Sequence, residues 1–246
     1  MDNSKVWKDC IGSISNLIEE ADFEINTDSV EMKAMDPSHI ALADFQLSSD
    51  AFEEYDVDKA RKLGIDLDEM DKVVSRASNS DESIIEFTEE DNRLRLEFKG
   101  TSTRRFSLPL LELEEEELPE PDLNFTANAK ITAGAIKEGL KDAALIGDNV
   151  RFELSQGKFL MRIESDTGSA EMELAEGDED LEELSVEEPS QAMYNISYLE
   201  DMVKAAGSKD IVEIRHGKDL PIEFVFNLAD GKGRLRFLLA PRVEAE

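Results

Sequence analysis

Apolar residues recur every three or four positions in four separate stretches of the chain, a spacing that places them on one face of an α-helix. These stretches predict helices over residues 5–20, 66–77, 131–145 and 196–207. The segments after each helix alternate apolar and polar residues, as half-buried antiparallel strands do. Turn residues at Asp91-Asn92, Gln156-Gly157, Gly217 and Gly231 interrupt the alternation and predict hairpins. The pattern therefore predicts an α+β fold.

The order of predicted elements occurs twice along the chain, as helix, strands, helix, strands. The second helix of each half carries a similar set of residues, because Leu67, Met70 and Lys72 match Leu199, Met202 and Lys204. A duplication of about 120 residues is the simplest explanation of a repeat at this spacing. The chain is therefore expected to hold two similar domains.

The stretch LELEEEELPEPDL, residues 111–123, fits neither a helix nor a strand. Its adjacent glutamates repel one another, and Pro119 and Pro121 fix φ and remove two backbone donors, so we expect an extended connector. A plain spacer is the alternative, although leucines interleave with the acids. The expected boundaries are a domain at 1–110, a connector at 111–124 and a domain at 125–246.

Acidic residues dominate the composition, with 58 Asp and Glu against 27 Lys and Arg and a formal net charge of −31. Since 40% of the residues are hydrophobic, we expect the acid to coat a folded surface rather than to mark disorder. A solubility coat or adaptation to high salt is the general explanation for most of it. The single cysteine, Cys10, lies among apolar residues and is expected to be a buried thiol.

The sequence contains no membrane span and no recognisable catalytic site. No apolar run approaches the roughly 18 residues that a span needs, so we expect a cytoplasmic protein without membrane contact. There are only two histidines, His39 and His216, and no cysteine and histidine cluster has metal-ligand spacing. We therefore expect no enzymatic activity, no metal and no cofactor.

Lysines occupy the polar faces of the predicted helices. Lys72 with Arg76, and Lys137 with Lys141, are spaced i, i+4 and so share a helix face. If the four helices share one side of the molecule, that side is locally basic on an acidic protein. Ordinary solvated helix faces are the alternative interpretation.

Five segments closely resemble the sliding clamp of DNA replication, the proliferating cell nuclear antigen family, in its archaeal form. They are AMDPSHIAL at 34–42, LGIDLDEMDKVV at 63–74, the connector ending in Leu118-Pro119, SYLEDMVKA at 197–205 and FLLAPRVE at 237–244. The resemblance follows the chain in order over essentially its whole length. It implies a homotrimeric ring of two similar α+β clamp domains per subunit, with sheets outside and helices lining a channel for duplex DNA.

The resemblance also implies site residues. The positions that match DNA-facing ones in the family are Lys8, Lys72, Lys137, Lys141 and Lys204. They are expected to contact phosphates without reading bases. Arg76 is a further candidate for DNA binding, with a place at the subunit junction as its alternative. Asp9 and Ser15 stand where lysines often occur in the family, so direct DNA affinity is expected to be low.

The connector resembles the interdomain loop that borders a partner-peptide pocket in this family. The matching pocket positions are Met35, His39, Ile40, Leu42, Leu118, Pro119, Leu123, Pro221, Leu238, Ala240 and Pro241. The expected ligand is a short motif with a glutamine, an aliphatic residue and two aromatics. Partners of this kind are DNA polymerase, flap endonuclease, DNA ligase and the clamp loader.

Ring closure requires an edge strand of each domain to pair with a neighbouring subunit. The candidate strands are TSTRRFS at 101–107 and SAEMELA at 169–175, and their charges are complementary. The expected interface residues are Arg104, Arg105, Glu138, Asp142, Glu171 and Glu173. An alternative of a different class is an acidic DNA mimic or interaction module that does not encircle DNA. For the clamp, the expected location is the cytoplasm, in association with the nucleoid.

Overall fold

The computed structural model describes residues 4–88, 91–114, 118, 122–166 and 168–243, with side chains from Trp7 onward. Contacts divide the chain into two compact units. Unit 1 contains residues 1–118 and 227–235, and unit 2 contains residues 119–226 and 236–246. Within the described residues, no helix has the length and apolar character needed to cross a membrane.

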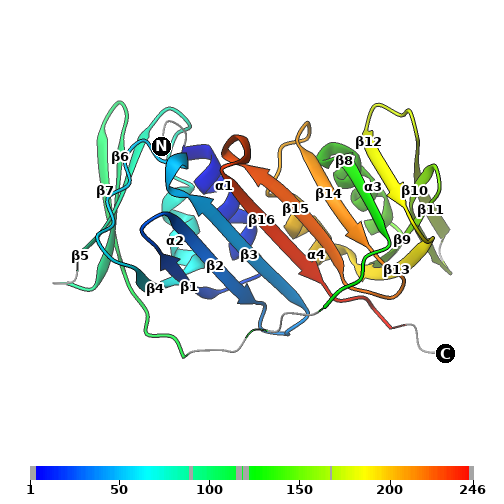
Figure 1. Ribbon diagram of the computed structural model, residues 1–246, viewed down its shortest axis with the longest axis horizontal. Helices are drawn as coiled ribbons and strands as arrows, with labels where there is room; N and C mark the ends of the chain where they lie inside the picture. The colour runs from blue at the N-terminus through cyan, green and yellow to red at the C-terminus, as the bar shows by residue number, and fades with distance from the viewer. Residues whose placement is uncertain (1–3, 89–90, 115–117, 119–121, 167, 244–246) are drawn as a thin grey trace. The chain divides into compact units, whose positions relative to one another are not determined.

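Unit 1 contains two helices and two antiparallel sheets (Figure 1). Its elements are α1 (Ser4–Ser15), β1 (Glu20–Ile25), β2 (Ser29–Met35), β3 (Ala41–Ser48), the 3₁₀ turn η1 (Ser49–Ala51), β4 (Arg61–Asp66), α2 (Leu67–Val74), β5 (Glu82–Thr88), β6 (Arg93–Lys99) and β7 (Thr103–Pro109). One sheet has the order β3-β2-β1-β4 and the other the order β5-β6-β7. The two helices pack against each other.

Unit 2 repeats this arrangement. Its elements are β8 (Ala127–Thr132), α3 (Ala133–Ala144), β9 (Asn149–Ser155), β10 (Lys158–Ser165), β11 (Gly168–Ala175), β12 (Leu181–Val186), β13 (Ser190–Asn195), α4 (Ile196–Val203), β14 (Ile211–His216), β15 (Ile222–Leu228) and, from Arg236 onward, β16 (Gly233–Leu239). The 3₁₀ turn η2 (Ala229–Gly231) between β15 and β16 falls in unit 1. The strand orders are β12-β8-β14-β15-β16 and β11-β10-β9-β13. Helices α3 and α4 pack against each other, and the tip of the β15–β16 hairpin groups with unit 1.

Local chemistry explains where three of the helices begin. Asp66 accepts a hydrogen bond from the backbone N–H of Glu69 at 2.9 Å and so caps α2. Asn195 and Thr132 cap α4 and α3 in the same way. The faces that these helices bury are fully apolar at their centres, as at Leu67, Met70 and Leu140, which are 0% exposed. The α+β duplication predicted from the pattern is therefore confirmed.

The sequence separation predicted between equivalent positions of the two halves was wrong by three residues. Helix α1 begins at Ser4 and α3 at Ala133, 129 residues later, and the caps Asp66 and Asn195 have the same separation. The match of Lys72 with Lys204 therefore pairs positions that are not equivalent. A shift of three residues is nearly one helical turn, so it leaves the apolar face almost unchanged and escapes a periodicity argument.

The first helix is shorter than predicted. It ends at Ser15, because Ile14 O accepts the N–H groups of both Leu17 and Ile18, each at 2.9 Å, in a closing turn. Leu17 and Ile18 are buried all the same, so the apolar spacing continues past the helix. Strand β1 then starts at Glu20, paired with Asp66 of β4.

Candidate functional site

Five of the six cations predicted to face DNA are engaged within the chain, namely Lys8, Lys72, Lys137, Lys141 and Lys204. Three of them form ion pairs one helical turn away, at 2.7 Å for Lys72 with Glu69, 2.8 Å for Lys141 with Glu138 and 2.7 Å for Lys204 with Asp201. The hydrogen bonds that Lys72 and Lys141 donate to Glu69 and Glu138 raise the pKa of the two lysines. Each of these pairs is exposed to solvent and screened by salt, so it exchanges easily with other partners.

Lys8 and Lys137 make a different kind of contact. Lys8 Nζ on α1 donates to the Ala77 carbonyl, just after α2, at 3.5 Å. Lys137 Nζ on α3 donates to the Ala206 carbonyl, just after α4. Both lysines are half-buried, and the two contacts are related by the 129-residue repeat. Each lysine therefore joins the first helix of its unit to the end of the second.

Among the described residues, the two strands predicted to close a ring are end strands of their sheets. Strand β7 ends the sheet β5-β6-β7 of unit 1, and β11 ends the sheet β11-β10-β9-β13 of unit 2. Both are labelled in Figure 1. An end strand leaves one row of backbone donors and acceptors available for another strand.

Five of the six charged side chains predicted at the subunit junction have intrachain ion-pair partners. Arg104 forms an ion pair with Asp81 and donates to the carbonyl of Arg76 at 2.6 Å, which ties β7 to the end of α2. The ion pairs on the remaining strand residues join Arg105 to Glu97, Glu171 to Arg162 and Glu173 to Lys158. Glu138 pairs with Lys141, and the backbone carbonyl of Asp142 accepts the N–H of Leu145. The side chains of Arg76 and Asp142 are exposed.

In unit 1, the predicted pocket residues lie on the hairpin between β2 and β3. A buried carboxylate, Asp36, organises this turn by accepting the N–H groups of Ser38 at 3.0 Å and of Ile40 and Ala41 at 2.7 Å each. His39 adopts the left-handed region at φ 55° and is exposed. Met35 and Ile40 are partly exposed, whereas Leu42 is buried. Asp36 is a positioning residue that sequence reasoning missed, although the Asp-Pro-Ser run is a turn signal.

In unit 2, the predicted pocket residues lie in the segment before β8, on the turn before β15 and at the end of β16. Leu238 is 6% exposed. The partly exposed members are Leu123, Pro221, Ala240 and Pro241. Strand β13 holds both segments, because Tyr194 Oη donates to the Leu220 carbonyl and Met193 O accepts the N–H of Arg242, each at 2.7 Å. Leu118 is partly exposed in unit 1, and Pro119 lies outside the described residues.

Backbone hydrogen bonds fasten the two ends of the connector, each within its own unit. Leu111 N donates to Gly64 O of β4 at 2.9 Å, and Thr126 N donates to His216 O of β14 at 3.1 Å. A side chain at Gly64 would bring its Cβ within 2.4 Å of the Leu111 carbonyl oxygen. Glycine is therefore required where the first end of the connector crosses β4.

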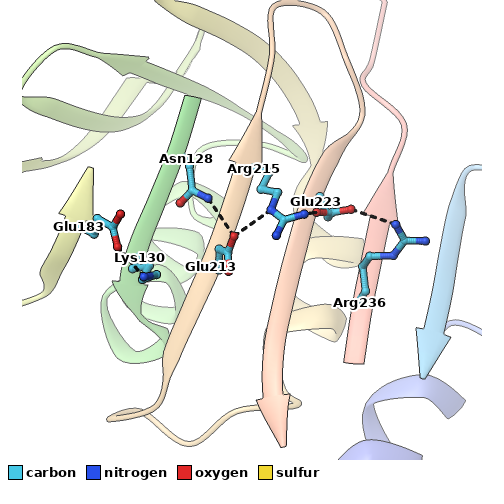
Figure 2. A network of polar contacts seen from close by, with 7 residues as sticks. All are labelled: Asn128, Lys130, Glu183, Glu213, Arg215, Glu223 and Arg236. Atoms are coloured by element: carbon cyan, nitrogen blue, oxygen red, sulfur yellow. Dashed lines mark hydrogen bonds and ion pairs between the residues drawn. The ribbon is translucent and has the colours of Figure 1, made fainter. Parts of the chain in front are cut away.

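A polar network crosses the sheet of unit 2 on the face turned away from its helices (Figure 2). Glu223 of β15 is 2% exposed and lies between Arg215 of β14, at 3.1 Å, and Arg236 of β16, at 3.3 Å. Arg215 also donates to Glu213, which accepts from Asn128 at 2.9 Å. Burial opposes ionisation of Glu213, but these hydrogen bonds outweigh it and lower its pKa.

The network has a neighbouring ion pair between Lys130 of β8 and Glu183 of β12. Together the two sets contain three cations and three carboxylates, so the surface that they form is formally neutral on a chain of charge −31. On β16, Arg236 and Leu238 point to the same face, since side chains alternate along a strand. The network therefore borders the unit 2 part of the predicted pocket.

Two shallow concavities within the described residues lie elsewhere. One of about 430 Å³ in unit 2 is lined by β9, β10 and β13, including Lys158, Arg162 and Gln191. One of about 340 Å³ in unit 1 lies beside Gly64 and Leu111. Neither is lined by a residue of the predicted pocket. No group of three or more His, Cys, Asp or Glu side chains in the described part of the chain has the arrangement of a metal site.

Two family models match the chain in order. The model of the proliferating cell nuclear antigen, N-terminal domain, matches residues 1–118, and the model of its C-terminal domain matches residues 120–242. A curated protein named DNA polymerase sliding clamp from Thermococcus onnurineus is 41% identical over 243 residues, covering 99% of this chain and 97% of that protein. The sliding clamp of Pyrococcus horikoshii is 39% identical with the same coverage.

Solved structures agree with these sequence matches. A crystal structure of PCNA from Thermococcus kodakaraensis superposes with a TM-score of 0.94 at 29% identity, covering 98% of both chains. A structure of the C-terminal region of FEN-1 bound to A. fulgidus PCNA superposes with a TM-score of 0.89 at 26% identity, covering 99% of this chain and 98% of that one.

Proposed function

Because the chain belongs to the proliferating cell nuclear antigen family, of archaeal type, we propose that it is a DNA sliding clamp. A sliding clamp is a processivity factor without catalytic activity. It holds a polymerase and other replication and repair enzymes on duplex DNA. The observation that carries the proposal is the match of both clamp-domain models in order, which together span residues 1–242. A free acidic DNA mimic has no comparable support.

The proposed assembly is a homotrimeric ring around duplex DNA. Pairing of β7 of one subunit with β11 of the next closes the ring, and the end positions of these strands support this pairing. Arg105 is the best placed of the predicted interface cations, because its side chain is 71% exposed, whereas Arg104 is engaged with Asp81 and Arg76. Glu171 and Glu173 on β11 are its proposed counterparts.

The helices of each subunit line the proposed channel. Lys72, Arg76, Lys141 and Lys204 are exposed and contact phosphates in this proposal. Contacts that are screened by salt and exchange with on-helix carboxylates are weak, which allows the ring to slide. The topology of the ring, more than its affinity, holds the duplex. A nucleoid-associated location in the cytoplasm follows from this function.

The first test is the mass of the protein in solution, by light scattering after size exclusion across a salt series. A mass near three times 27.6 kDa is expected once salt screens the acidic subunits from one another. Ring dissociation is expected at low salt. A monomer at every salt concentration would contradict self-assembly and would favour the acidic-mimic alternative.

The proposed partners are DNA polymerase, flap endonuclease, DNA ligase and the clamp loader. They dock through a glutamine-aliphatic-aromatic motif in the pocket beside the connector at 111–124. The FEN-1 complex of a structural relative supports peptide docking on this fold. Substituting Leu118→Ser and Leu238→Ser should abolish polymerase stimulation and leave the oligomer intact. Stimulation that survives in the trimeric variant would disprove the pocket assignment.

A further inference from the structure

Strand β13 holds the two segments of unit 2 that carry predicted pocket residues, and one of its contacts comes from a buried tyrosine. Tyr194 is 0% exposed, yet its hydroxyl reaches the backbone carbonyl of Leu220 at 2.7 Å. Leu220 directly precedes Pro221, which is a predicted pocket residue. The hydroxyl therefore bonds to the peptide group through which Pro221 is attached.

The turn that contains Leu220 lacks the ladder of hydrogen bonds that holds the neighbouring strands. It closes through Leu220 N donating to Gly217 O at 3.3 Å, which is long for a hydrogen bond. Asp219 adopts φ 54°, in the left-handed region that costs energy for a residue with a side chain. Contacts from outside the turn must therefore help to select its conformation, and Asp219 N donating to Gln191 O of β13 at 3.1 Å is one of them.

Packing of the aromatic ring of Tyr194 fixes its position independently of the hydrogen bond from the hydroxyl. The ring packs edge-on against Phe152 of β9 and His216 of β14, with centroids 5.9 Å away in both cases. His216 is held in turn by Ser190 of β13, since Ser190 Oγ lies 2.7 Å from His216 Nδ1. Burial raises the pKa of Tyr194, so the hydroxyl stays protonated and remains a donor. The donor thus lies on a rigid base and the acceptor on a weakly closed turn.

We propose that Tyr194 is a positioning residue for partner binding, which sets the Gly217–Pro221 turn so that Pro221 is presented to a docked peptide. The proposal rests on the proposed function, because it requires that the pocket binds a short glutamine-aliphatic-aromatic motif. Tyr194 acts through Leu220 and does not itself touch the peptide. Its ring contributes to the core, and its hydroxyl contributes to binding.

The test is the substitution Tyr194→Phe, which removes the hydroxyl and keeps the ring. Its matched control is Tyr55→Phe in unit 1, where the tyrosine hydroxyl also bonds to backbone carbonyls, at 2.5 Å to Asn26 O and 2.8 Å to Ser29 O. Affinity for a synthetic peptide with a glutamine, an aliphatic residue and two adjacent aromatics is measured by calorimetry on the full chain. Tyr194→Phe should bind about three- to tenfold more weakly, the factor expected for one net hydrogen bond. Tyr55→Phe should bind like the wild type.

Amide hydrogen exchange provides a second readout that a purely structural role would not produce. In Tyr194→Phe, exchange at Leu220 and Asp219 should accelerate while exchange within β13 stays unchanged. Wild-type affinity together with unchanged exchange in the turn would overturn the proposal and leave the proposed function standing. If neither the wild type nor Leu238→Ser binds the peptide at the same salt concentration, the proposed function and the role of Tyr194 would both be overturned.

Discussion

The ammonium group of Lys137 donates a hydrogen bond to the backbone carbonyl of Ala206, just beyond the last turn of α4. Lys8 has the equivalent contact with Ala77 in unit 1. The last carbonyls of a helix have no intrahelical partner, and a cation near them is stabilising. Both lysines were predicted to contact DNA, and in the structure each ammonium group bonds to a carbonyl in the turn that follows the second helix of its unit.

We predict that Lys137→Met destabilises the protein by about 1 kcal/mol, the usual contribution of one such hydrogen bond. It should leave the salt dependence of DNA binding unchanged if the ammonium group stays bonded to the Ala206 carbonyl when DNA is bound. Lys141→Met, on the exposed face of the same helix, is the control and should instead reduce the salt slope. The measurements are denaturant unfolding and duplex binding across a salt series. An unaltered stability with a shallower slope in Lys137→Met would show that Lys137 is a DNA contact.

We predict that Asp36→Ala destabilises unit 1 by about 1 to 3 kcal/mol, because three backbone N–H groups lose their acceptor. The β2–β3 turn should loosen, and peptide affinity should fall because His39 and Ile40 lie on it. Asp56→Ala, at an exposed position of the same unit, is the matched control. Denaturant unfolding and peptide calorimetry test the effect. Equal stability of the two variants would contradict a structural role of the Asp36 carboxylate.

We predict that His216 makes the protein sensitive to mild acid. Burial lowers the pKa of His216 from 6.5 to about 4 in the folded state. The folded state disfavours the imidazolium. The free energy of unfolding is therefore unaffected by His216 above pH 6.5, where the ring is neutral in both states, and it falls as pH drops toward 4. The loss amounts to about 2 to 3 kcal/mol.

The change His216→Asn removes the titration and keeps a polar partner for Ser190. Stability is measured by denaturant unfolding at several values between pH 4 and 7. The variant should lose less stability over this range than the wild type, since the titrating carboxylates are common to both. Identical pH dependence of the two proteins would refute the assignment.

We predict that Glu223→Ala destabilises the protein by about 1 to 3 kcal/mol, because Arg215 and Arg236, which are only partly buried, lose the carboxylate that they share (Figure 2). Replacing all three residues, with Arg215→Met, Glu223→Leu and Arg236→Met, should restore most of the stability, since neither arginine is then left without its carboxylate. Thermal and denaturant unfolding of both variants test this. A triple variant less stable than Glu223→Ala would mean that the network itself is strongly stabilising.

Periodicity in the sequence predicted the helices and strands, but it did not predict how the two halves of the chain align or where the helices end. It predicted all four helices and the duplication, yet it placed Lys72 opposite Lys204 and extended α1 past Ser15. Both errors have one cause, which is that apolar spacing reports the buried face and not the helix ends. The ends depend on hydrogen bonds, such as the cap at Asp66 and the closing turn at Ile14.

The sequence by itself determined the α+β class, the two similar halves and the family, because these follow from spacing and from segments such as AMDPSHIAL. Only the tertiary structure decided what individual polar side chains contact. Tyr194 and Glu223 bond to groups brought close by folding, and Lys137 meets Ala206 from 69 residues away. Such contacts leave no periodic signal, because a hydrogen bond depends on distance and direction in space and not on separation along the chain.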